Sequence, residues 1–364
     1  MPRVAVVAAR PNDWRRGVCG WWRYRSSSMI ERVVQRVEAG QSLSVAEMEE
    51  TMDVVIQGQC PEDLVARLLL ALRRKGETVE EVAGAATALR KHVCPIRSRR
   101  SDVLDTCGTG GDGSRTFNIS TAAALVAAAA GVPVAKHGNR AVTSRSGSAD
   151  VLAALGVNIE ADVARVEACL EELGICFCFA PLLHQAMRHV APVRKRLGVP
   201  TIFNLLGPLT NPAGATRQLL GVGRRDLQPL LAEALRLLGT RRAVVVHGLE
   251  GLDEVSLSGP TCAAQVGPDG VQWFQWEPAD FGVPAQAMDD LVVEGPQHSA
   301  EVIRRVLAGQ RGPARDVVIL NAAAALWVAG RAESPAACAR MAAEAIDSRA
   351  AETLLARLAE RTHA

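Results

Sequence analysis

The first group of residues that could do chemistry is a glycine-rich segment, DTCGTGGDG at residues 105–113, which the pattern places between a short strand and a helix. Its glycines permit positive φ angles and close approach of the backbone, so that consecutive N–H groups can face an anion. The following helix presents its positive N-terminal end to the same place, where four side chains can donate to phosphate oxygens: Thr116, Asn118, Ser120 and Thr121. The segment lacks the Gly-Lys-Ser/Thr ending of a P-loop and the GxGxxG fingerprint, which excludes the usual ATP and NAD sites. It predicts a phosphate site, and the alternative is a glycine-rich turn without a ligand.

A second polar segment follows the next expected strand: KHGNRAVTSRSGS, thirteen residues at 136–148. Loops of this length are uncommon in compact α/β units unless they bind something. Lys136 and Arg140 can neutralise a phosphate. Hydroxyl groups near the start of the next helix can donate to the same anion: Ser144, Ser146 and Ser148. The segment predicts a second anion loop, and the alternative is a solvated basic loop.

Two adjacent carboxylates, Asp253 and Glu254, stand just past a buried apolar strand in VVVHGLEGLDE at 244–254. Hard oxygen ligands of this kind hold Mg²⁺, which then bridges to the phosphates of a substrate. An isolated pair on a loop is typical of a solvated edge. Beside two anion loops, the pair instead indicates a metal site that serves a polyphosphate.

A fourth segment, FAPLLHQAMRHVAPVR at 179–194, combines two histidines with two arginines. An arginine fork pairs bidentately with a planar carboxylate, so Arg188 and Arg194 are candidates for selecting a second, carboxylated substrate. The alternative for His184 and His189 is packing on a helix surface.

Two kinds of element must position these segments. Residues 29–93 read as helices throughout, with capping-box spacing of Ser44 with Glu47 and of Thr78 with Glu81 at two helix starts. Beyond them, short apolar strands alternate with helices, which is typical of an α/β sheet. We expect strands at 103–105, 132–135, 175–179, 243–246 and 255–257, and helices at 119–130, 148–155, 163–173, 227–238, 317–328 and 334–346.

The expected architecture is an α/β protein with a small all-helical N-terminal domain and a large α/β domain, whose mostly parallel central sheet is flanked by helices. We expect three parts: a basic extension at 1–28, a helical small domain at 29–98 with a return segment near 185–212, and the large domain at 99–364. The extension carries six arginines against one aspartate, a net charge of +5, and we expect it to be disordered. It lacks the continuous apolar region of a signal peptide.

Composition excludes several classes of protein. The chain has 364 residues, 48% hydrophobic and 22% charged, which suits a globular protein and excludes disordered, collagenous and fibrous ones. Its 41 basic and 39 acidic residues leave a net charge of +2, so no global basic field marks a protein that binds nucleic acid or a membrane surface. No apolar run approaches the roughly 18 residues that cross a bilayer. The nine cysteines are odd in number and scattered, which indicates free thiols in a reducing compartment, and we expect a cytoplasmic protein.

The four segments, in this order and spacing, resemble those of the anthranilate phosphoribosyltransferases, the enzymes of tryptophan biosynthesis that join anthranilate to phosphoribosyl pyrophosphate (PRPP). The likeness covers residues 29–364, and its motifs are GTGGD, NIST, KHGNRAVTSRSGSAD, APVRK, TIFNLLGPLTNPAG and GLDE. It implies a helical small domain packed on a phosphoribosyl-binding α/β domain, an active site at their hinge, Mg²⁺ as cofactor and a homodimer formed through the small domains. The chain departs from the family pattern at Gln185, where proline is usual, and at Pro200, where arginine is frequent.

The resemblance also implies which residues bind each ligand. PRPP would be held by Gly108, Gly111, Asp112, Thr116, Asn118, Ser120, Thr121, Lys136, His137, Gly138, Asn139, Arg140, Ala141, Val142, Thr143, Ser144 and Ser148. Anthranilate would be bound by Gly108, Asn139 and Arg194. The metal would be coordinated by Ser120, Asp253 and Glu254.

Residue chemistry and resemblance agree on displacement at the anomeric carbon of the ribose, with Mg²⁺ and N–H donors stabilising the departing pyrophosphate and the anthranilate amine as nucleophile. Positioning can supply most of the acceleration, so no catalytic residue is assigned, and His137 is the nearest candidate for proton transfer. Two alternatives stay open: a pyrimidine nucleoside phosphorylase-like enzyme of the same architecture, and a non-catalytic relative that binds nucleic acid. The carboxylate pair favours pyrophosphate over free phosphate, and the net charge of −3 beyond the extension disfavours nucleic acid.

Overall fold

The computed structural model describes residues 28–141 and 145–364. The expectations for Val142, Thr143 and Ser144, and for all but the last residue of the basic extension, lie outside the described residues. Within the described part of the chain, no helix is long and apolar enough to cross a membrane.

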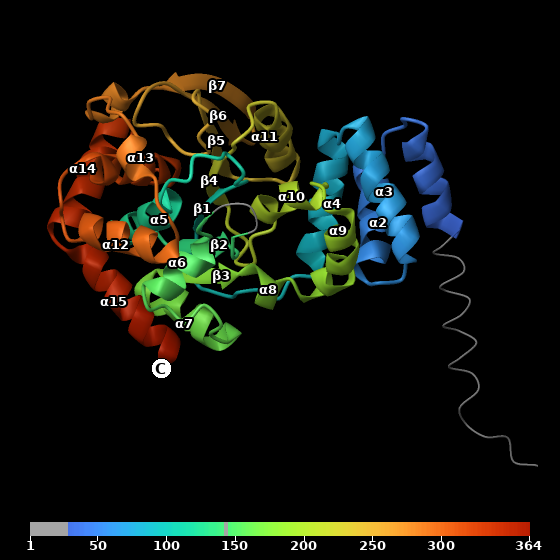
Figure 1. The fold of residues 1–364 in the computed structure, drawn as a ribbon, viewed down its shortest axis with the longest axis horizontal. Coiled ribbons are helices and arrows are strands. Elements are labelled where there is room, and N and C mark those ends of the chain that lie inside the picture. Colours follow the sequence, from blue (N-terminus) through green and yellow to red (C-terminus); the bar gives the residue numbers. More distant parts are fainter. Residues whose placement is uncertain (1–27, 142–144) are drawn as a thin grey trace, which may run out of the picture.

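The N-terminal part is a bundle of helices, drawn in blue in Figure 1. It comprises a helix over residues 28–38, then α2 (Val45–Ile56), α3 (Glu62–Lys75) and α4 (Val79–Lys91). Both expected capping boxes are confirmed: Ser44 and Glu47 exchange hydrogen bonds at the start of α2, and Thr78 and Glu81 do so at the start of α4. Each box satisfies backbone N–H groups that a helix start leaves unpaired, which is why the local sequence sets these boundaries.

A seven-stranded sheet forms the centre of the larger part (Figure 1). Its strands are β1 (Leu104–Gly108), β2 (Val134–Gly138), β3 (Ile175–Phe179), β4 (Arg217–Gly221), β5 (Arg242–Gly248), β6 (Thr261–Gly267) and β7 (Gly270–Trp276). Their order is β3-β2-β1-β4-β5-β6-β7. The first five in this order are parallel, and β6 and β7 are antiparallel additions at one edge. The expected fold class is therefore confirmed.

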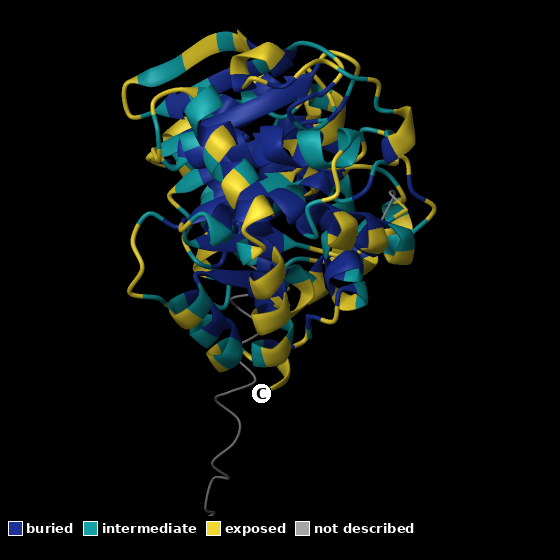
Figure 2. Ribbon diagram, turned by 90° about the vertical axis from the view of Figure 1, so that its left-hand side faces the viewer, coloured by how far each residue is buried: buried dark blue, intermediate teal, exposed yellow. Residues whose placement is uncertain are grey.

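Helices cover both faces of the sheet, because alternate side chains of its buried strands point to opposite sides. Val244 and Val246 of β5 join one hydrophobic core, whereas Ala243 and Val245 join another that continues into the N-terminal bundle. Figure 2 shows strands buried beneath helices whose outer faces are exposed. The edge strand β7 is the exception, because only Trp276 of that strand is buried. The helices of the larger part are α5 (Ile119–Ala129), α6 (Ser148–Ala154), α7 (Val163–Leu173), α11 (Leu227–Leu237), α12 (Pro296–Leu307), α13 (Pro313–Val328), α14 (Pro335–Asp347) and α15 (Ala350–His363).

The chain between β3 and β4 leaves the sheet, passes along the bundle and returns. It contains α8 (Ala180–Leu183), η1 (Gln185–His189), α9 (Ala191–Leu197), α10 (Phe203–Leu206) and η2 (Gly207–Leu209). Helix α9 contacts α3, and α10 contacts α4 (Figure 1). Val193 of α9 and Phe203 of α10 belong to the same core as the bundle helices.

One expected strand was wrong. Residues 255–257, all within the described part of the chain, form no strand. Their side chains Val255 and Leu257 are buried, as an apolar run suggests, but the backbone of Val255 is paired with the side chain of Asn321. An apolar run is therefore buried here without forming a strand. Strands β4, β6 and β7 and helices α12 and α15 were not expected from the sequence.

Candidate active site

The candidate site lies where the order of the parallel strands reverses. From β1 the chain proceeds to β2 and β3 on one side, while β4 pairs with the other side of β1. Ligands of open α/β sheets bind in the crevice beyond the carboxyl ends of the strands at such a switch point. A cavity of about 410 Å³ lies there, lined by the loops after β1, β2 and β5 and by the segment that returns from the bundle.

The glycine-rich loop after β1 has the backbone that its sequence predicts. Gly110 and Gly111 have φ angles of 66° and 77°, a region that favours glycine. The loop is tied down at both ends: the Thr109 N–H donates to the Gly221 carbonyl at 2.9 Å, and Thr116 forms an isolated β-bridge with Val292. The loop thus holds its N–H groups at the cavity before any ligand arrives.

The two carboxylates approach this loop closely. Asp253 Oδ2 accepts a hydrogen bond from the Gly110 N–H at 2.9 Å, and Glu254 Oε1 accepts one from the Ser120 N–H at 3.0 Å. Enclosure by the protein, reinforced by neighbouring negative charge, raises the pKa of Asp253 to about 7 and that of Glu254 to about 8. Two carboxyl groups whose ionised forms are disfavoured therefore lie together, and a bound cation would favour their ionisation.

Close packing at the end of β4 leaves no room for a side chain. A Cβ on Gly221 would stand 1.6 Å from the carbonyl oxygen of Asp253, and one on Gly108 would stand 2.5 Å from Oδ2 of the same residue. Glycine is required at Gly221 because of close approach to backbone rather than positive φ, whereas at Gly108 a Cβ would displace the Asp253 carboxylate. The loop that carries Asp253 and Glu254 can pack against the end of β4 only because Gly221 has no side chain.

Lys136 lines the cavity although little of it is exposed. Its side chain is buried, and Nζ donates to the carbonyl of Thr106 and, at 3.2 Å, to the hydroxyl of Ser120. Burial lowers the pKa of this ammonium group, and the nearby carboxylates Asp105 and Glu254 oppose that effect. Lys136 therefore holds the Ser120 hydroxyl and interacts electrostatically with Glu254 and Asp253.

Asn118 joins the two predicted anion loops. Its Nδ2 donates to the Ser146 carbonyl at 3.0 Å, and its Oδ1 accepts from the hydroxyls of Ser146, at 2.6 Å, and Ser299, at 2.8 Å. Ser299 is fully buried and belongs to α12, far along the chain. Asn118 thus links the loops, and the sequence alone offered no signal for the role of Ser299.

The guanidinium of Arg140 forms ion pairs with carboxylates of the protein. Its guanidinium pairs with Asp150 at 3.2 Å and with Glu160 at 3.5 Å, and 54% of the side chain is exposed. Asp150 also accepts hydrogen bonds from the N–H groups of Ala141 and Gly147, which closes the base of the second loop. Arg140 therefore contributes to the shape of this loop.

Arg194 stands on the segment that returns from the bundle. Its guanidinium lies 5.5 Å from the ring centre of Phe203, and its NH2 donates to Asn204 Oδ1 at 3.5 Å. Burial lowers the pKa of the guanidinium. Packing against the ring and the amide aims a planar cation at the cavity, as carboxylate binding requires.

Most of the residues expected to bind ligands line this one cavity. They are Gly108, Gly111, Asp112, Thr116, Asn118, Ser120, Lys136, His137, Gly138, Asn139, Arg140, Ala141, Ser148, Arg194, Asp253 and Glu254. Thr121 is instead buried and, within the part of the chain that the structure describes, its hydroxyl has no hydrogen-bond partner.

Arg145, a cation of the second loop, also lines the cavity. Further lining residues were not expected: Arg115, Phe203, Asn204 and Gly207. Phe203, Asn204 and Gly207 belong to the motif TIFNLLGPLTNPAG at residues 201–214, which carries no ionisable group and so showed no chemical signal. No group of three or more His, Cys, Asp or Glu side chains suited to a metal occurs among the described residues, so a metal here would depend on the carboxylate pair, a hydroxyl and substrate oxygens.

Comparison with known proteins first defines a class. Residues 100–352 match the α/β domain of a glycosyl transferase family, and residues 28–93 match the helical bundle domain of such a family. The fold and the site are those of a glycosyltransferase built from these two domains.

Individual relatives narrow the class to one family. Anthranilate phosphoribosyltransferase of Rhodopirellula baltica is 50% identical over 327 residues, which cover 90% of this chain and 96% of that protein. The crystal structure of the enzyme from Thermus thermophilus has a TM-score of 0.86 and 45% identity and covers 91% of this chain and 99% of that one. The Saccharomyces cerevisiae enzyme in complex with PRPP and Mg has a TM-score of 0.83 and 30% identity, with 92% and 98% covered. The chain belongs to the anthranilate phosphoribosyltransferase family.

Proposed function

We propose that this protein transfers the phosphoribosyl group of PRPP to the amine of anthranilate, giving N-(5-phosphoribosyl)anthranilate and pyrophosphate. One observation carries the proposal: the carboxylates of Asp253 and Glu254 are hydrogen-bonded to the N–H groups of Gly110 and Ser120, so that a metal site and an anion loop adjoin. A magnesium polyphosphate needs both within a few ångströms.

In the proposed reaction the amine nitrogen forms a bond to the anomeric carbon while the bond from that carbon to the pyrophosphate oxygen breaks, and the amine releases a proton to solvent. N–H groups of the glycine-rich loop and the start of α5 would take up the charge that develops on the pyrophosphate. The PRPP-binding set would be Gly108, Gly111, Asp112, Thr116, Asn118, Ser120, Thr121, Lys136, His137, Gly138, Asn139, Arg140, Ala141, Val142, Thr143, Ser144 and Ser148.

His137 is poorly suited to accept the amine proton. Its Nδ1 lies 2.9 Å from the Gly207 carbonyl oxygen, and its Nε2 lies 3.0 Å from Nε2 of His184. Both ring nitrogens are therefore engaged within the protein. This supports a reaction that depends on positioning and on stabilisation of the leaving group, without a dedicated general base.

The residues present fit Mg²⁺. Asp253, Glu254 and the Ser120 hydroxyl are hard oxygen donors, and the raised pKa values of the two carboxyls mean that their ionised forms are unfavourable until a cation joins them. We propose that these three residues hold the metal. When bound, Mg²⁺ would neutralise pyrophosphate oxygens and stabilise their departure. The yeast relative solved with PRPP and Mg supports the use of Mg²⁺.

Anthranilate would be held by its carboxylate on Arg194, with Gly108 and Asn139 completing the site. Arg194 lies on the returning segment, whereas Gly108 is the last residue of β1 and Asn139 follows β2. Closure of the bundle against the sheet would therefore bring the two substrates together.

The test is a fluorescence assay in which purified protein, PRPP and Mg²⁺ consume anthranilate. Loss of anthranilate fluorescence that depends on both PRPP and Mg²⁺ supports the proposal. Folded protein without turnover over a range of both substrates would refute it. Phosphorolysis of uridine or thymidine without metal would instead establish the nucleoside phosphorylase alternative.

We also propose a homodimer formed through the helical bundle. An open concavity on the bundle is lined by Glu38, Arg67, Leu70, Ala71, Arg73 and Arg74, and Leu70 is 43% exposed there. An exposed leucine flanked by paired charges suits a partner surface. Native mass measurement of the protein at micromolar concentration tests the dimer.

We propose a cytoplasmic location, because all eight cysteines in the described residues are free thiols.

A further inference from the structure

We propose that Asn321 is a positioning residue that holds Glu254 in register with Ser120 for metal binding. The inference rests on the proposed function of the carboxylate pair. Asn321 lies in the middle of α13 and is 0% exposed. A polar side chain in such a place must have its hydrogen bonds satisfied within the protein.

The hydrogen bonds of Asn321 are directed at the residue after Glu254. The Val255 N–H donates to Asn321 Oδ1 at 2.9 Å, and Asn321 Nδ2 donates to the Val255 carbonyl at 3.0 Å and to the Val317 carbonyl at 2.9 Å. One backbone donor and two carbonyl acceptors leave a single amide orientation that satisfies all three. The side chain therefore grips both backbone polar groups of one residue.

This grip replaces a strand neighbour. Val255 is buried with 1% exposure, so its N–H and C=O need partners inside the protein. In a sheet the adjacent strand would supply both. Here residues 255–257 run as an irregular segment, and Asn321 supplies the two hydrogen bonds from a helix 66 residues further along the chain.

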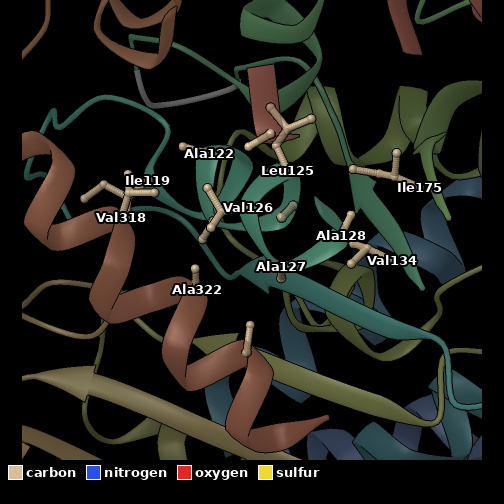
Figure 3. Close-up of a cluster of buried hydrophobic side chains, with 14 of the residues drawn as sticks. Ile119, Ala122, Leu125, Val126, Ala127, Ala128, Val134, Ile175, Val318 and Ala322 are labelled. Atoms are coloured by element: carbon tan, nitrogen blue, oxygen red, sulfur yellow. The ribbon is translucent and has the colours of Figure 1, made fainter. Parts of the chain in front are cut away.

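Helix α13 braces the other half of the site as well. It packs along α5, and in Figure 3 Val318 of α13 lies beside Ile119 of α5. Ile119 directly precedes Ser120, whose N–H donates to Glu254 Oε1 at 3.0 Å. One rigid helix thus contacts the segments that carry both sides of the proposed metal site, and Asn321 is its polar contact with the carboxylate side.

Replacement of Asn321 should weaken the binding of Mg²⁺ more directly than the binding of any other ligand. Mg²⁺ requires near-ideal octahedral geometry, so a small displacement of Glu254 relative to Ser120 weakens its coordination. Residues that orient metal ligands typically change metal affinity by about 10- to 100-fold when they are replaced. Arg194, which would bind anthranilate, lies on a different segment that Asn321 does not contact in the described structure.

The experiment compares Asn321→Ser, which is polar but too short to reach both groups of Val255, with Leu326→Ala as a matched control. Leu326 is equally buried in α13 and belongs to its apolar core. Calorimetric titration with PRPP at low and at saturating Mg²⁺ measures how much the metal strengthens PRPP binding, independently of turnover. The Mg²⁺ concentration at half-maximal rate and the anthranilate KM are measured in parallel.

We expect the metal-dependent gain in PRPP affinity to fall about tenfold in Asn321→Ser, with the half-maximal Mg²⁺ concentration rising and the anthranilate KM unchanged. Leu326→Ala should lower the melting temperature and leave the metal dependence as in the parent protein. A metal dependence within twofold of the parent in folded Asn321→Ser would overturn the proposal. If the parent protein binds PRPP with Mg²⁺ but does not consume anthranilate, the proposed function fails while the positioning role stands or falls on the calorimetry alone.

Discussion

His137 and His184 face each other with their Nε2 atoms 3.0 Å apart. His137 Nδ1 lies 2.9 Å from the Gly207 carbonyl, which can only accept, so this nitrogen carries the proton. His137 Nε2 is then the acceptor, and His184 Nε2 is the donor. Gly207 and His184 belong to the segment that runs to the bundle and back, whereas His137 lies near the end of β2, so the pair joins that segment to the sheet.

This arrangement predicts a loss of stability in acid. Burial lowers the pKa of His137 to about 3 and that of His184 to about 4, against about 6.5 in an unfolded chain. Below pH 6.5 the unfolded state therefore binds more protons at these histidines than the folded state does. The contribution of the neutral pair to the free energy of unfolding is fully present above pH 6.5 and is lost as the pH falls toward 4. The free energy of unfolding is measured by denaturant titration at pH 7.5 and at pH 5. We expect its decrease between these two pH values to be smaller in His184→Gln than in the parent protein by on the order of 2 kcal/mol. Equal losses in both proteins would contradict this.

Gly221→Ala should nearly abolish activity. The new Cβ would stand 1.6 Å from the Asp253 carbonyl oxygen, and backbone cannot yield as a flexible side chain can, so the carboxylate loop must move. We expect a loss of kcat/KM on the order of 10²-fold, the scale seen when a group that stabilises the transition state is displaced. Gly259→Ala is the control, since a Cβ there meets nothing within 4 Å. Similar activities of the two variants would show that the loop tolerates displacement.

Glu254→Gln should separate stability from activity. Enclosure and the charge of Asp253 raise the pKa of Glu254 to about 8, so its ionised form is unfavourable in the metal-free protein. A neutral amide of the same shape should leave the melting temperature without Mg²⁺ unchanged or higher. The rate at saturating PRPP and ordinary Mg²⁺ should fall on the order of 10²-fold. Full activity in this variant would remove Glu254 from the metal site.

Arg194→Ala should act on the second substrate. Its guanidinium is held against Phe203 and Asn204 on the returning segment and would pair with the anthranilate carboxylate. A lost charge-assisted hydrogen bond of about 1.5–3 kcal/mol corresponds to a rise of about tenfold or more in the anthranilate KM. The KM for PRPP should change little, and Arg196→Ala on the same helix serves as a control at an exposed ion pair. A change confined to PRPP would contradict the assignment.

Several features of the fold and of the candidate site were predictable because their signals are local. The positive φ angles of Gly110 and Gly111, the capping boxes at Ser44 and Thr78, and the start of α5 at Ile119 each depend on a few neighbouring residues. Strands β6 and β7 were missed because a strand is stabilised by its partner rather than by its own sequence. Thr121 shows the limit within a helix: its neighbour Ser120 lines the cavity, whereas Thr121 is buried.

The sequence by itself determined the helical N-terminal part, the alternation of strands and helices that follows it, and the chemical character of the two loops and the carboxylate pair. Through these features it also determined the family. Tertiary structure decided which groups meet. The pairing of Asn321 with Val255, of Asn118 with Ser299 and of His137 with His184 joins residues 66, 181 and 47 positions apart. Such contacts leave no local pattern, because a buried polar group is satisfied by whichever partner the packed fold brings within about 3 Å.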